Sequence, residues 1–219
     1  MSDIKNIEQH YSLDERPFLE KVRGFCQLVD DRYSPYLTDF LNPREIQIVE
    51  ELAHYYNLKF FVSSTLESEE YGRVILAPEY YELDDEDFEI KRLEISYARQ
   101  FNKLTHPKVL GALINQLGLD RQVFGDIILD EEGRVQFSIA SHLASYAIMT
   151  ITKIGNVSVT LKEVSKDDWI SNQENYSQSF VLLSSMRLDN VLATVLNLSR
   201  SNALKLIASG KVKLNNDKA

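Results

Sequence analysis

Residues 186–215 read MRLDNVLATVLNLSRSNALKLIASGKVKLN, and this stretch predicts two short helices followed by a strand. Apolar residues recur at the three- and four-residue spacing of a helix face: Leu188, Val191, Leu192 and Val195. Ser199 is a favourable N-cap for the second helix, and Gly210 suits the left-handed turn that ends a helix. The alternation of polar and apolar residues over 211–214 then indicates a half-buried strand.

The polar residues of this stretch are mostly basic, with Asp189 as the single acid among them. Arg200 falls in the first turn of the second helix, where a cation opposes the helix dipole. An external anion would explain this position, since backbone N–H groups, the Ser199 hydroxyl and the guanidinium could converge on one phosphate. The alternative interpretation is a solvated basic helix face without a ligand.

The same stretch resembles the S-four RNA-binding domain, a module named after a small-subunit ribosomal protein. The resemblance is carried by Arg187-Leu188-Asp189, Leu198-Ser199-Arg200-Ser201, Ala203, Ile207 and Gly210-Lys211-Val212-Lys213-Leu214-Asn215. It implies that structured RNA lies against the two helices and the following loop. The RNA contacts that it implies are Arg187, Ser199, Arg200, Lys205, Lys211 and Lys213. Asp189 would orient a neighbouring basic side chain. The family usually continues into a strand hairpin beyond Asn215, so a truncated module is expected here.

The charge of the chain is unevenly distributed. The 219 residues include 33 acidic and 24 basic side chains, for a net charge of −9. Residues 1–185 contain 31 acids and 18 bases, a net −13, whereas residues 186–219 contain two acids and six bases, a net +4. Screening acts over about 8 Å at physiological salt, so an acidic body one domain away weakens the basic region only modestly. The charge distribution is therefore compatible with RNA binding.

Composition also constrains the class of protein. The hydrophobic content of 44% is too high for a disordered chain, and no apolar run approaches the length of a membrane span. The first residues lack the pattern of a signal peptide, and the single Cys26 cannot form an internal disulfide. These features predict a soluble cytoplasmic protein.

Residues 1–85 predict a mainly helical domain with a small hairpin. A helix is expected over 14–32, and Asn42-Pro43-Arg44-Glu45 is a typical start for another. Strands are expected over 58–63 and 73–77. Arg44 and Arg73 are interpreted as partners in surface or inter-element salt bridges. The acids over 80–89 include no glycine between them, which favours a solvated linker over a metal site.

Residues 86–165 predict a central domain with the order βαββαβ, the split-βαβ arrangement shared by RNA-recognition modules and unrelated proteins. Strands are expected over 91–97, 124–129, 135–140 and 157–164, with helices from Thr105 and Ser141. Base stacking on this sheet is disfavoured, because the third strand carries one aromatic residue, Phe137. Arg121 is a further candidate for phosphate contact, with a buttressing ion pair as the favoured alternative.

The predicted fold class is therefore α+β. It comprises the domain of residues 1–85, the central domain of 86–165, a linker over 166–183, and the S-four-like module of 184–219.

The whole chain also resembles the YlmH family, bacterial proteins whose genes lie in a cell-division cluster. The resemblance is carried by Leu104-Thr105-His106-Pro107, Leu110-Gly111, Asp120-Arg121, Gly125-Asp126-Ile127 and Lys153-Ile154-Gly155, followed by the basic module. It implies an RNA-binding protein that recognises rRNA and tRNA at the ribosome. A related heat-shock family with the same small module recognises large subunits blocked by peptidyl-tRNA, so a role in rescue or quality control is expected. The alternative is a protein-interaction adaptor in cell division.

Catalysis is not indicated by any motif. The four histidines lack the paired spacing of a metal site, and the eight glycines form neither a phosphate loop nor a dinucleotide fingerprint. No nucleophile, base and orienting group can be assigned. The sequence therefore predicts a non-enzymatic protein without a metal or a small-molecule cofactor.

Overall fold

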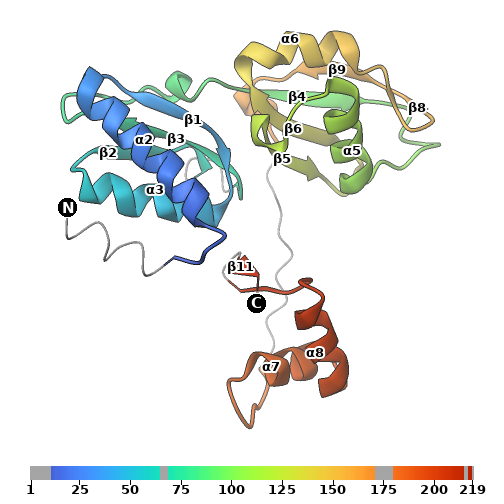
Figure 1. Cartoon of the computed structure of the whole chain (residues 1–219). Coiled ribbons are helices and arrows are strands. Elements are labelled where there is room, and N and C mark those ends of the chain that lie inside the picture. The colour runs from blue at the N-terminus through green and yellow to red at the C-terminus, as the bar shows by residue number, and fades with distance from the viewer. Residues whose placement is uncertain (1–10, 65–68, 171–179, 215–216, 219) are drawn as a thin grey trace. The chain divides into compact units, whose positions relative to one another are not determined.

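The computed structural model describes residues 11–64, 69–170, 180–214 and 217–218, and side chains up to residue 212. The chain divides into two compact units, Met1–Gln173 and Glu174–Ala219, and the first of these contains two lobes (Figure 1). Within the described residues, no helix combines the length and apolar character needed to cross a membrane.

The first lobe is a three-stranded antiparallel sheet covered on one face by two helices (Figure 1). Its elements are α2 (Arg16–Arg32), β1 (Tyr36–Leu41), α3 (Pro43–Tyr55), β2 (Lys59–Val62) and β3 (Gly72–Ala77). Asn42 and Glu45 form a capping box at the start of α3, as the sequence indicated. The expected hairpin pairs as predicted, but β1 adds a strand that the pattern did not reveal, and β3 becomes the central strand.

The central lobe confirms the βαββαβ order. Its elements are β4 (Ile90–Ser96), α5 (His106–Leu117), β5 (Phe124–Leu129), β6 (Val135–Ala140), α6 (Ser141–Thr150) and β9 (Thr160–Glu163). The strands pair antiparallel in the order β5-β6-β4-β9. The strand expected over 157–164 is split, because β8 (Val157–Ser158) pairs with β7 (Lys153–Ile154) in a small separate ribbon. Both helices pack on one face of the main sheet, over Leu93, Phe137 and Ile139.

The opposite face of the central sheet contacts the first lobe. Alternation along β4 and β6 turns Arg92 and Ser138 away from the helices, and Asp126 lies where β5 has a register shift between Phe124 and Ile127. Arg92 forms an ion pair with Glu69, and their side chains are 3% and 4% exposed. The Asp126 carboxylate accepts hydrogen bonds from the backbone N–H groups of residues 70 and 71. These buried polar contacts connect the two lobes of the first unit.

Gly125 provides a test of this contact. A Cβ at Gly125 would lie 2.7 Å from Cε1 of Phe40 and 2.9 Å from Cβ of Ser138. Because both neighbours are buried, we expect Gly125→Ala to lower the free energy of unfolding by about 1–3 kcal/mol. A Cβ at Gly111 in α5 would meet no neighbouring atom within 4 Å, so Gly111→Ala should raise stability by about 0.5–1 kcal/mol. Urea unfolding of both variants measures these changes, and equal effects would contradict the close approach.

Candidate nucleic-acid interface

The C-terminal unit contains the two helices expected from the S-four resemblance. These are α7 (Leu188–Val195) and α8 (Arg200–Ala208), followed by β10 (Lys213–Leu214) and β11 (Asp217–Lys218). Ser199 caps α8, since its hydroxyl accepts a hydrogen bond from the Asn202 N–H at 3.3 Å. Gly210 has a φ of 65°, the left-handed conformation predicted for the end of this helix. The backbone therefore places Arg187 before α7 and Arg200 in the first turn of α8.

A buried carboxylate joins these two helix starts. Asp189 is 4% exposed, and it accepts a hydrogen bond from Nε of Arg187 at 3.1 Å and from Nε of Arg200 at 2.6 Å. The two arginine side chains are 67% and 59% exposed, respectively. Within the described part of the chain, the terminal nitrogens of both guanidiniums have no hydrogen-bond partner. We call this arrangement of Arg187, Asp189 and Arg200 the arginine clamp.

The clamp confirms that Asp189 orients basic side chains, and it does so for two of them. Both arginines form internal ion pairs, yet each uses Nε and leaves its outer edge toward solvent. An outer edge of this kind presents parallel N–H donors suited to phosphate oxygens. The internal pairs therefore hold the guanidiniums in position and leave donors available for an external anion.

The hydrogen bonds from Arg187 and then from Arg200 lower the pKa of Asp189 from its ordinary value of 3.8 to about 2. Because the folded-state pKa lies below the unfolded one, the clamp contributes its full stabilisation above about pH 4. This contribution should be lost as the pH falls through about 2. NMR titration of the Asp189 carboxyl carbon measures the pKa, with Asp189→Asn as the control that removes the signal. Titration near 3.8 would contradict the clamp.

The other cations expected to bind RNA lie outside the clamp. Lys205 and Lys211 are exposed, and neither forms an ion pair among the described residues. At about 100° per residue, Lys205 lies roughly 140° around α8 from Arg200, so these two side chains do not share one stripe. The backbone of Lys213 pairs with Lys218, while the Lys213 side chain lies outside the described set. The structure thus brings together Arg187, Ser199 and Arg200, and it leaves Lys205 and Lys211 outside this group.

Three arginines of the first unit have structural partners. Arg44 forms the expected inter-element salt bridge, with Nε 2.7 Å from Glu15. The prediction of a salt bridge for Arg73 was wrong, because the Arg73 guanidinium donates to backbone carbonyls, including that of Thr38 at 2.8 Å. The prediction of a buttressing ion pair for Arg121 was also wrong. Its guanidinium donates to the Phe124 carbonyl and lies 4.2 Å from the centroid of the Tyr71 ring.

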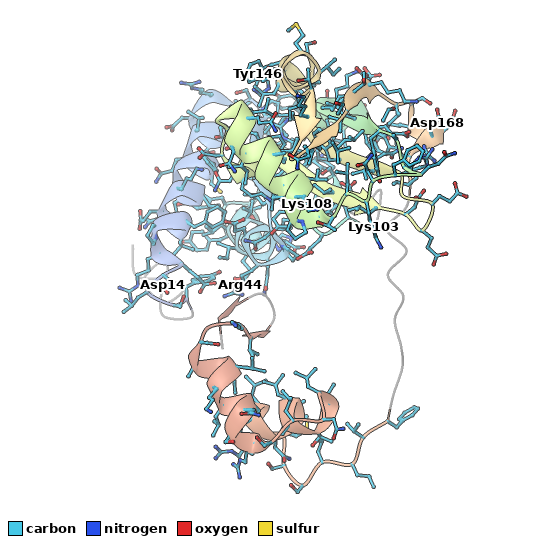
Figure 2. The ribbon with its side chains drawn as sticks, turned by 90° about the vertical axis from the view of Figure 1, so that its right-hand side faces the viewer. Asp14, Arg44, Lys103, Lys108, Tyr146 and Asp168 are labelled. Atoms are coloured by element: carbon cyan, nitrogen blue, oxygen red, sulfur yellow. The ribbon has the colours of Figure 1, made fainter. Side chains whose placement is uncertain are left out.

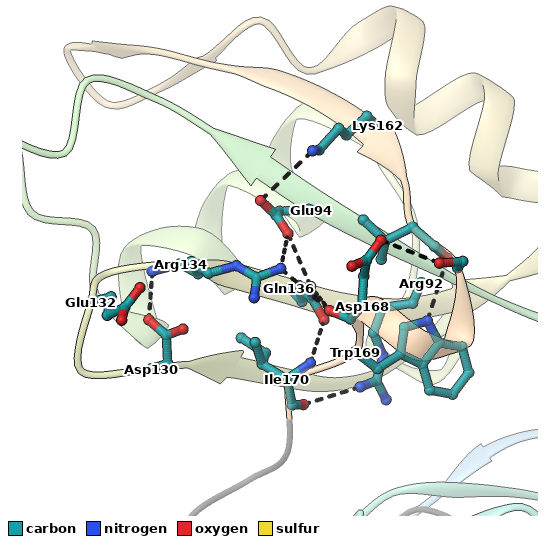
Figure 3. Close-up of polar contacts among 12 residues, drawn as sticks. Arg92, Glu94, Asp130, Glu132, Arg134, Gln136, Lys162, Asp168, Trp169 and Ile170 are labelled. Carbon is teal, nitrogen blue, oxygen red and sulfur yellow. Dashed lines mark hydrogen bonds and ion pairs between the residues drawn. The ribbon is translucent and has the colours of Figure 1, made fainter.

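The sheet face that RNA-recognition modules use for base stacking is occupied in this protein (Figure 3). Gln136 donates to the Asp168 carbonyl at 2.9 Å and accepts from the Ile170 N–H at 3.0 Å. The Trp169 ring lies 4.1 Å from the Arg92 guanidinium. The segment after β9 therefore covers this face on one side, and Glu69 covers it on the other. The sequence did not indicate this cover, because Gln136 and Ser138 alternate with apolar residues as on a solvated face.

The acidic segment before β4 forms a short 3-10 helix, η1 (Asp85–Phe88), with Asp84 as its N-cap. Asp87 accepts a hydrogen bond from the Tyr81 hydroxyl. Across the residues that the structure describes, no group of three or more His, Cys, Asp or Glu side chains could hold a metal ion. The arrangement favours a structural role for these carboxylates.

Two protein-family models match parts of the chain. Residues 84–168 match the model described as "Putative RNA-binding domain in YlmH", and residues 186–219 match the S4 domain. The chain is 32% identical over 212 residues to the ribosome-associated protein quality control protein P2 of Bacillus subtilis (strain 168), a match that covers 97% of this chain and 82% of that protein. It is 40% identical to the solved structure of the cell division protein ylmH from Streptococcus pneumoniae. That match has a TM-score of 0.66 and covers 74% of this chain and 98% of the other.

Proposed function

Because the chain belongs to the YlmH family of RNA-binding proteins, we propose that it acts at the ribosome as a non-catalytic RNA-binding factor. The arginine clamp is the observation that carries this proposal. It combines two exposed guanidiniums and a capped helix start within the residues that match the S4 domain. Backbone N–H groups at a helix start and outward-facing guanidinium edges are suited to phosphate. Lys205, Lys211 and Lys213 add positive charge to the same domain.

The proposed partner is structured RNA of the large ribosomal subunit, namely rRNA together with a tRNA held on it. The curated relative of similar length is named for ribosome-associated quality control, which supports this choice. The net charge of −13 over residues 1–185 opposes non-specific attachment to nucleic acid, so it favours a site with matching shape. We therefore propose a role in the rescue or quality control of stalled large subunits.

The competing proposal is a protein-interaction adaptor in cell division. Its support is the name of the pneumococcal relative, and it assigns no ligand to the outward donors of the arginine clamp. It predicts a protein complex that persists after RNA is removed.

Sedimentation of cell extracts on sucrose gradients distinguishes the two proposals. The ribosomal role predicts that the protein migrates with large subunits and shifts to the top of the gradient after nuclease treatment of the isolated complex. A complex that retains its size after nuclease treatment, with no protein in the large-subunit fractions, would support the adaptor instead.

A further inference from the structure

The central lobe belongs to a family described as RNA-binding, but its sheet face is closed. Glu69 and Trp169 both contact Arg92 on that face, and the 168–170 backbone bonds to Gln136. Gln136 and Ser138 are fully buried as a result. Any RNA contact by this lobe must therefore use another surface.

The two segments that form the helical side of the lobe contain no acidic residue. Residues 95–119 and 133–162 together contain no Asp or Glu and six Lys or Arg residues. Since residues 1–185 carry −13 in total, the remainder of that region carries −19. Two of the six cations, Arg134 and Lys162, lie near Glu94 on the sheet side. The helices α5 and α6 thus present an acid-free surface on an otherwise acidic body.

Three lysines of this surface are available for an external anion. Lys103 precedes α5, Lys108 lies in its first turn, and Lys153 lies in β7, which contacts α5. All three are exposed, and none forms an ion pair among the residues whose side chains are described. Figure 2 shows Lys103 and Lys108 near one end of α5, whereas Tyr146 of α6 lies toward the other end, where its hydroxyl meets the Leu117 carbonyl.

Exposed aromatic rings accompany these cations. Phe101 is 85% exposed, although its loop is well anchored. Leu104 is 2% exposed, and the Asn102 side chain donates to the Ala98 carbonyl at 3.1 Å. Tyr146 is 42% exposed and donates its hydroxyl to the Leu117 carbonyl at 3.3 Å. Exposed rings on an anchored backbone, next to lysines, are the elements with which proteins hold unpaired bases and their phosphates.

We propose that this surface, formed by Phe101, Lys103, Lys108, Tyr146 and Lys153, is a second RNA-binding surface of the protein. We call it the helix face. It rests on the proposed function, because it gives the same RNA-binding factor a contact independent of the arginine clamp. The lysines bind phosphates, and Phe101 stacks on a base in an unpaired loop. This use of the lobe differs from base stacking on an open sheet, which the buried polar cover prevents.

Charge reversal in the full-length chain tests the helix face. The variant Lys103→Glu with Lys108→Glu is compared with Arg16→Glu with Lys21→Glu, which makes the same charge change at exposed positions of α2. The probe is a labelled RNA hairpin with an unpaired loop, titrated at several salt concentrations. The helix-face variant should bind at least about tenfold more weakly, and its log–log salt slope should fall by about two or more.

Removal of one ring tests the stacking contact separately. Phe101→Ala should weaken binding of the looped hairpin by about fivefold or more and leave a blunt duplex of the same stem unaffected. Because Phe101 is 85% exposed, this variant should retain the wild-type unfolding midpoint. Equal losses on hairpin and duplex would exclude stacking on an unpaired base.

The outcomes separate this inference from the proposed function. If the clamp variant Arg187→Gln with Arg200→Gln weakens binding and the helix-face variants bind as the wild type does, the helix face is wrong and the proposed function stands. If the α2 control weakens binding as much as the helix-face variant, net charge explains the effect and the helix face is again wrong. If neither clamp nor helix-face variants weaken binding, both proposals fail.

Discussion

Neutralising Arg200 and Lys205 together, as Arg200→Gln with Lys205→Gln, is expected to weaken RNA binding at least about a hundredfold at physiological salt. Each lost charge-assisted hydrogen bond to a phosphate contributes about 1.5–3 kcal/mol, and two are removed. The salt slope should also fall by about two. Glutamine retains an N–H donor for Asp189, so the start of α8 should keep its position. Fluorescence polarisation with a labelled RNA hairpin, repeated over a salt series, measures both quantities.

The matched control is Arg16→Gln with Lys21→Gln, which removes the same two charges from exposed positions of the first lobe. It should change the affinity less than about threefold, since these residues lie outside both proposed surfaces. Circular dichroism of the Arg200→Gln, Lys205→Gln variant verifies that α7 and α8 remain folded. A folded variant with wild-type affinity would exclude Arg200 and Lys205 from the RNA contact.

Loss of Glu69 should produce the largest change in stability. Glu69→Ala removes the carboxylate that accompanies Arg92 in a pair whose side chains are only 3% and 4% exposed. Breaking one side of a buried pair typically costs about 3–5 kcal/mol, because the remaining charge stays in a poorly solvated site. The Ser138 hydroxyl would lose its contact with Glu69 as well, 3.2 Å in the native protein. Urea denaturation of the full-length chain measures the loss.

Replacement of both partners provides the informative comparison. Glu69→Leu with Arg92→Met removes both charges and restores apolar volume, so it should cost much less than Glu69→Ala alone. A Glu69→Ala variant within about 1 kcal/mol of the wild type would contradict a strongly stabilising buried contact between Glu69 and Arg92.

The sequence predicted those elements whose patterns are local. The start of α3 follows from Asn42 and Pro43, and the end of α8 follows from Gly210. The βαββαβ order follows because apolar periodicity changes clearly between helices and strands. In each case, the residues that determine the structure lie within a few positions of one another.

The features that the sequence did not reveal depend on distant contacts. Strand β1 includes the buried polar residue Thr38, whose hydroxyl accepts the Val74 N–H at 2.9 Å, so its pattern is not a simple alternation. Gln136 and Ser138 occupy positions typical of a solvated strand face, yet residues far along the chain cover them. A polar residue on a strand can face water, or it can be buried and bonded to a residue that is distant in the chain. The sequence pattern is the same in both cases.

The candidate site shows the same division. The family resemblance indicated Arg187, Arg200 and Asp189, and the helix starts place these residues as expected. It did not indicate that one carboxylate would bind both guanidiniums, since this depends on the angle between α7 and α8. The predictions for Arg121 and Arg73 were wrong because their partners are backbone carbonyls and an aromatic ring. A carboxylate partner can be sought among the acidic residues of a sequence, whereas every residue has a carbonyl.

The cover over the central sheet limits how this protein can be divided. The segment that bonds to Gln136 extends to Ile170, and Arg92 forms an ion pair with Glu69, so the cover includes residues outside the family match of residues 84–168. A fragment cut at those borders would expose to water the Arg92 guanidinium, the Gln136 amide and the Ser138 hydroxyl, which are buried in the full-length chain. The residues that match the family model therefore differ from the residues that bury this sheet face. We therefore expect a fragment that keeps Glu69 and Ile170 to be more stable than one cut at residues 84 and 168.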